Sequence, residues 1–187
     1  MKSKKKNATL LIVCFSFSFL NAQYEIKPEK GYTTQIGLMV DMLEELKDRI
    51  AEDIRDLDQA ETDYLFDDKA NSIGAMIMHL VATEAYTQVE TLEERIWTDE
   101  EREFWIIAAG LGAESRDQLK GKPIKYYLDL WDQVRKKTLE GLKAKKDAWF
   151  AARIDESMNN HWAWFHILEH QANHMGQIAL VKKRLPK

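Results

Sequence analysis

The sequence is poor in cysteine, proline and glycine. Of its 187 residues, 1 is cysteine, 3 are proline and 8 are glycine. The cysteine, Cys14, lies in an N-terminal apolar run that we expect to be removed, so the mature chain would contain neither a disulfide nor a thiolate ligand. Any metal site in it must then be built from histidine, aspartate and glutamate.

The N-terminus has the pattern of an export signal. Lysines crowd residues 2–6, an apolar run spans residues 8–20, and Asn21-Ala22 supplies a small residue for cleavage. The run is shorter than the roughly 20 residues that a bilayer-spanning helix needs. We therefore expect residues 1–22 to be a signal peptide, and residues 23–187 to form a periplasmic or secreted domain with no stable membrane anchor after signal removal.

The mature chain would be acidic. The full sequence has a formal net charge of -4, and losing the four lysines of the signal changes this to -8. An acidic surface repels phosphate backbones, and most remaining lysines alternate with acids along the expected helices. There is also no glycine-rich phosphate loop and no nucleophile elbow. We expect no nucleic-acid partner.

Apolar residues recur at three- and four-residue steps over most of the mature chain, which indicates an all-α fold. The first long helix is expected from Thr33 or Thr34 to about residue 54, and the second from Asn71 or Ser72 towards Glu94. A third follows Pro123 to about residue 146, and the last spans about residues 158–184. Four long helices predict a four-helix bundle.

The connection between the second and third helices, residues 95–122, is unusually long. It mixes acids with tryptophan, phenylalanine and isoleucine, and we expect a short helix over residues 99–109. Connections of this length often cover the mouth of a pocket.

The histidines are the strongest chemical signal. The last helix holds four of the 5, and His79 lies in the almost wholly apolar start of the second helix. Two residues four positions apart on a helix are separated by about 40° around the helix axis and by about 6 Å along it. The pairs His166/His170 and His170/His174 can therefore each bind one ion. Spacing alone does not decide between these two pairs. His79 can supply the third ligand from across the bundle, since an unpartnered imidazole in the core would cost on the order of a few kcal/mol.

The histidines, and the nearby glutamates and aromatic residues, also have interpretations that involve no metal. A lone histidine on an apolar helix usually bonds a backbone carbonyl, and His161, on another face of the helix, is expected to be solvated or to cap the helix. Glu84 and Glu169 are candidates for partners of the metal-binding imidazoles or for proton acceptors, or else are surface carboxylates. The aromatic residues of the last third could form a pocket wall or simply pack the bundle, namely Trp149, Trp162, Trp164 and Phe165.

Two segments resemble the DinB-like (DinB/YfiT) superfamily of metal-binding four-helix bundles. One is Asn71-Ser-Ile-Gly-Ala-Met-Ile-Met-His79-Leu, and the other is His166-Ile-Leu-Glu-His170-Gln-Ala-Asn-His174-Met-Gly-Gln177-Ile. The resemblance spans residues 33–185 and implies that His79, His170 and His174 bind the metal. It departs from many members at Met175, where they have arginine. Some relatives are transferases that use bacillithiol, mycothiol or glutathione.

Our leading hypothesis is an exported protein that holds zinc, nickel or iron with these three histidines and acts on a small molecule as a hydrolase or thiol transferase. The alternative is a non-catalytic envelope protein that uses the bundle for binding or for interaction, including a homodimer through exposed faces. A third hypothesis is a bundle without metal, in which hydrogen bonds within the protein satisfy the histidine ring nitrogens.

Overall fold

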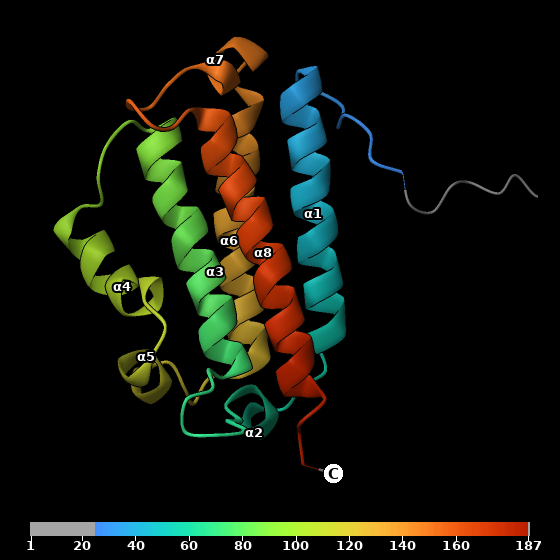
Figure 1. Ribbon diagram of the computed structural model, residues 1–187, viewed down its shortest axis with the longest axis vertical. Coiled ribbons are helices and arrows are strands. Elements are labelled where there is room, and N and C mark those ends of the chain that lie inside the picture. Colours follow the sequence, from blue (N-terminus) through green and yellow to red (C-terminus); the bar gives the residue numbers. More distant parts are fainter. Residues whose placement is uncertain (1–24, 187) are drawn as a thin grey trace, which may run out of the picture.

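The computed structural model describes residues 25–186. The predicted signal peptide lies outside these residues and stays a prediction, which the mass of the mature chain would test. The long helices α1 (Thr34–Ile54), α3 (Ile73–Thr87), α6 (Ile124–Lys143) and α8 (Asn160–Lys182) form a bundle (Figure 1). The prediction of an all-α four-helix bundle is confirmed.

The direction of the helices explains the long connection. In Figure 1, α1 and α8 run one way along the bundle while α3 and α6 run the other way. A short turn can join antiparallel neighbours, whereas the parallel pair α3 and α6 needs a segment that returns along the full length of the bundle. That segment carries α4 (Asp99–Ala109) and α5 (Ala113–Gln118) outside the four long helices.

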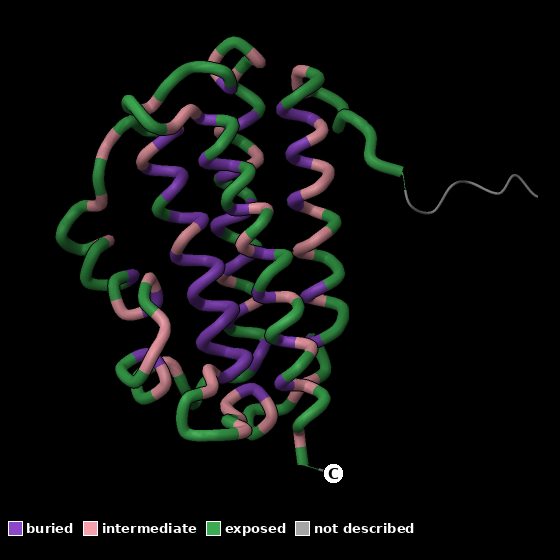
Figure 2. Tube along the Cα trace, in the orientation of Figure 1, coloured by how far each residue is buried: buried purple, intermediate pink, exposed green. Residues whose placement is uncertain are grey.

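Helix α3 is the most deeply buried element, as Figure 2 shows. It begins where the Ser72 side chain accepts a hydrogen bond from the backbone N–H of Ala75. Its last turn widens into the π-helical segment η1 (Gln88–Leu92). Near its start, a Cβ on Gly74 would lie 2.9 Å from the Tyr127 ring, so glycine here lets α3 and α6 approach closely.

The long helices begin and end close to where periodicity placed them, and α4 has the predicted bounds. Three short helices were not predicted: α2 (Gln59–Thr62), α5 and α7 (Asp147–Ala151). Periodicity cannot reveal helices of one or two turns. Local capping could have indicated α2, because Asp58 and Glu61 form a reciprocal capping box.

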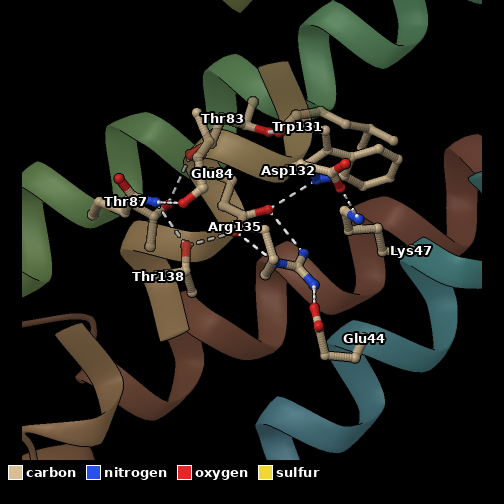
Figure 3. A network of polar contacts seen from close by, with 12 residues as sticks. Glu44, Lys47, Thr83, Glu84, Thr87, Trp131, Asp132, Arg135 and Thr138 are labelled. Atoms are coloured by element: carbon tan, nitrogen blue, oxygen red, sulfur yellow. Dashed lines mark hydrogen bonds and ion pairs between the residues drawn. The ribbon is translucent and has the colours of Figure 1, made fainter. Parts of the chain in front are cut away.

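A buried ion pair crosses the core between α1, α3 and α6 (Figure 3). The Arg135 guanidinium donates to both carboxylate oxygens of Glu84, at 2.7 and 2.8 Å, and to Glu44 at 2.7 Å. Trp131 and Thr138 also donate to the Glu84 carboxylate. The side chains of Arg135 and Glu84 are 2% and 0% exposed. The expectation that Glu84 is a surface carboxylate or a partner of the histidines is therefore wrong, because its oxygens are taken by this network.

No helix within residues 25–186 combines the length and the apolar character that a bilayer-crossing segment requires.

Candidate metal centre

Three histidines from two neighbouring helices meet in the bundle. His79 comes from α3, and His170 and His174 lie one turn apart on α8. One ring nitrogen from each lies within 4.8 Å of the others, and the Nε2 atoms of His79 and His170 are 2.9 Å apart. The rings of His170 and His174 stack with centroids 4.7 Å apart. The structure thus brings together the three histidines that the family motif selects.

Two of these rings are oriented through their Nδ1 atoms. His79 Nδ1 donates to the backbone carbonyl of Ala108 at 2.8 Å, and His174 Nδ1 donates to Oε1 of Gln177 at 3.0 Å. An oxygen of this kind only accepts, so each Nδ1 carries the proton and each Nε2 keeps a lone pair. Hydrogen bonds of this type hold most metal-binding imidazoles in place.

The donor set fits a divalent metal ion. Imidazole–metal bonds are about 2.0–2.1 Å, so two nitrogens that bind one ion lie at most about 4.2 Å apart. The 2.9 Å between Nε2 of His79 and Nε2 of His170 is within this limit, and the nitrogens of all three histidines lie within 4.8 Å of one another. The carbonyl of Ala108 satisfies only one nitrogen of His79, which leaves its Nε2 facing that of His170. The cluster can therefore hold one ion between its ring nitrogens.

Burial keeps these imidazoles uncharged at neutral pH. Desolvation lowers the pKa of His79 from its usual value, against the opposing hydrogen bonds to backbone carbonyls. Burial, followed by repulsion from the neighbouring histidines, lowers the pKa of His170 and of His174 to about 4. Only a neutral imidazole can bind a metal, so the site is ready for an ion without first losing protons.

Acid should lower the stability of the metal-free protein through these histidines. Because the folded-state pKa values of His170 and His174 are about 4, below the ordinary histidine pKa of 6.5, the unfolded chain binds more protons between these limits. The free energy of unfolding of the metal-free protein should therefore fall as the pH is lowered from about 6.5 to about 4. Urea titrations across this range would test this. The double variant His170→Gln/His174→Gln should lose part of the slope; an unchanged slope would contradict the prediction.

The other two histidines lie apart from the cluster. The ring of His166 stacks on Trp162, with centroids 5.1 Å apart, and its Nδ1 lies 3.2 Å from Glu169. His161 is exposed and stacks on Phe150. Glu169, which was expected to be either a partner of the metal-binding imidazoles or a surface group, is exposed and pairs with His166.

Two partners of the site were missed at the sequence level. Gln177 stands three residues after His174 within the quoted motif, so helical spacing could have revealed its contact. The Ala108 carbonyl belongs to the connection between α3 and α6 and has no side-chain signal at all.

A pocket of about 500 Å³ opens beside His170. It lies between α3, α8 and the start of the long connection, so that connection does border the site. Among the four aromatic residues considered as pocket walls, Trp162 lines this pocket, whereas Trp164 is buried in the core. The residues lining the pocket are mostly apolar: Ala82, Thr83, Tyr86, Thr87, Glu90, Trp97, Ala109, Met158, Trp162, Ala163, His166, Ile167 and His170.

Comparison with known proteins agrees with the fold and the motif. A solved structure, described as a conserved protein from Enterococcus faecalis, superposes with a TM-score of 0.63 at 14% identity, covering 79% of this chain and 94% of that chain. This likeness shows the fold alone. Comparison with curated proteins finds no match. The model of a DinB/YfiT-like family, described as mycothiol-S-transferase, matches residues 38–186. This match confirms the resemblance, and the chain belongs to the mycothiol-S-transferase family.

Proposed function

We propose that this protein is a metal-dependent thiol transferase that joins a low-molecular-weight thiol to a small electrophile. The observation that carries the proposal is the convergence of three neutral imidazoles beside a pocket, in a chain of the mycothiol-S-transferase family. His79, His170 and His174 would hold the ion. Zinc, nickel and iron all accept imidazole ligands, so elemental analysis of the purified protein has to identify the metal.

Each part of the site has a role in this reaction. A bound divalent cation lowers the pKa of a thiol or water at its open positions. The hydrogen bonds from His79 to Ala108 and from His174 to Gln177 keep the binding nitrogens aimed at one point. The pocket beside His170 would hold the electrophile and keep water from competing with the thiol.

The test is a rate measurement with defined thiols. Monochlorobimane would serve as the electrophile, with mycothiol, bacillithiol and glutathione as separate thiol donors. We expect at least one of them to support metal-dependent conjugation, and His174→Ala to lower that rate by at least about 100-fold because a ligand is lost. His161→Ala is the matched control, since His161 lies on the same helix and outside the cluster and the pocket.

Stoichiometric metal without turnover of any thiol would overturn the transferase proposal. That result would favour the non-catalytic envelope protein, in which the same site binds metal for recognition or assembly. Hydrolysis of esters or amides that is abolished by His174→Ala would instead favour the hydrolase.

A further inference from the structure

We propose that the pocket beside His170 binds an elongated arylalkylamine, with its ring between Trp162 and Tyr86 and its ammonium group at Glu90. The identity of this ligand as the electrophilic substrate rests on the proposed function. Its chemical class rests on the pocket alone.

The walls of the pocket present aromatic faces from two sides. On α8, the rings of Trp162 and His166 stack nearly parallel, at an interplanar angle of 10°. On the other side, Tyr86 meets Trp97 edge to face, with centroids 5.2 Å apart. Trp162 remains 50% exposed and Tyr86 39% exposed, so ring surface is available on both walls. Such a slot favours a flat ring over a branched aliphatic group.

The polar groups of the α3 wall are largely occupied. The hydroxyl of Thr83 donates to the carbonyl of Leu80, and that of Thr87 donates to the carbonyl of Thr83. Neither hydroxyl proton is therefore free to bind an anionic or carbonyl group of a ligand. The middle of the slot behaves as an apolar surface.

The charge of the pocket is set by one carboxylate. Glu90 is the only acidic residue that lines it, and no lysine or arginine lines it. Glu90 accepts a hydrogen bond from the Tyr86 hydroxyl at 3.3 Å and forms no ion pair within residues 25–186. A half-buried carboxylate beside aromatic rings favours an ammonium group and disfavours a carboxylate or phosphate.

The two arginines that share a pocket with Glu90 are engaged with other groups. Arg95 and Arg153 line a separate pocket that shares Glu90. Arg95 is held by Glu93 at 2.6 Å and by Glu101 at 2.6 and 2.7 Å. Arg153 donates to the backbone carbonyl of Asp155. The negative charge of Glu90 is therefore available to a positively charged ligand.

The spacing along α3 sets the length of the ligand. Glu90 follows His79 by eleven residues, which corresponds to about 16 Å along a helix, and less across the π-helical turn. Glu90 and His170 line the pocket, and Nε2 of His79 lies 2.9 Å from Nε2 of His170, so the ammonium group and the reacting group should be separated by about 10–15 Å. The ring then spans the slot between them.

Calorimetric titration with three matched probes tests this proposal. The probes are 4-phenylbutylamine, 4-phenylbutanol and 4-phenylbutanoate, which share a phenyl ring on a four-carbon chain and differ in its end group, an ammonium, a hydroxyl or a carboxylate. The amine should bind at least about fivefold more tightly than the alcohol, and the carboxylate more weakly than either. Glu90→Gln should bring the amine to the affinity of the alcohol. Glu103→Gln, which changes an exposed glutamate of α4 outside the pocket, should leave the order unchanged.

Binding of the carboxylate as tightly as the amine, no binding of any probe, or an amine preference that survives Glu90→Gln would each overturn the proposal. If Glu90→Gln does not fold, the order of the three probes on the wild-type protein decides. The titrations are run on the protein as purified and again after treatment with EDTA. A preference for the amine that persists without metal supports this inference even if the thiol assays fail, so the two proposals fail separately.

Discussion

Replacing Arg135 by methionine should lower the free energy of unfolding by about 3–5 kcal/mol. The substitution leaves the Glu84 carboxylate fully buried without the cation that donates to both of its oxygens. Burial alone would raise the pKa of Glu84, and the contacts with Arg135, Thr138 and Trp131 outweigh it, so that the pKa is lowered. For a domain of this size the melting temperature should fall by about 6–20 °C, measurable by calorimetry.

A second substitution shows how much of this loss of stability comes from the unpaired Glu84 charge and how much from the loss of the Arg135 side chain's packing. Adding Glu84→Gln to Arg135→Met removes the unpaired charge but keeps an oxygen that can accept from Trp131 and Thr138. The double variant should recover a large part of the free energy of unfolding that Arg135→Met loses. Arg55→Met is the matched control, because Arg55 pairs with Glu52 at the exposed surface and should cost less than about 1 kcal/mol. A double variant less stable than Arg135→Met alone would contradict the prediction.

Adding zinc to the metal-free protein should raise its melting temperature by about 5–11 °C when zinc is present at about 100 times its dissociation constant. An ion that binds only the folded state stabilises it by about 2.7 kcal/mol under these conditions. His170→Ala should abolish the shift and the bound metal, because His170 lies 2.9 Å from His79 and stacks on His174 in the cluster.

His166→Ala is the sharpest control for this experiment. His166 lies one turn before His170 on the same helix, and its ring is outside the three-histidine cluster. This variant should keep both the zinc-induced shift and the stoichiometry of bound metal. Equal losses in the two variants would mean that the other candidate pair, His166 and His170, binds the ion. A wild-type protein without any shift would favour the bundle that satisfies its own histidines.

Much of the fold could be predicted because its signals are local. The apolar stripe of α1 and the almost wholly apolar first half of α3 predicted two of the long helices of the bundle. The four-residue spacing of His170 and His174 fixed their common face before any neighbour was known. The apolar context of His79 already indicated it as the third ligand, but choosing His174 over His166 as the partner of His170 required the family motif, since spacing alone allowed both pairs.

The remaining features depend on contacts between distant segments. Glu84 has the sequence context of a helix surface, and only α6 supplies the arginine that makes its burial tolerable. The partner of His79 is a backbone carbonyl, which carries no residue preference. The pocket is formed where α3, α8 and the connection meet, so the role suggested for Glu90 could not be inferred from its neighbours in the chain.

The hydrogen bond from His79 to Ala108 joins two parts of the molecule that differ greatly in burial. Ala108 lies near the end of α4, in the segment outside the four long helices, whereas His79 belongs to the central helix (Figure 2). If α4 moved away, His79 would lose the acceptor that holds its ring and its tautomer. Displacement of α4 would therefore free the His79 ring from the orientation in which its Nε2 faces that of His170.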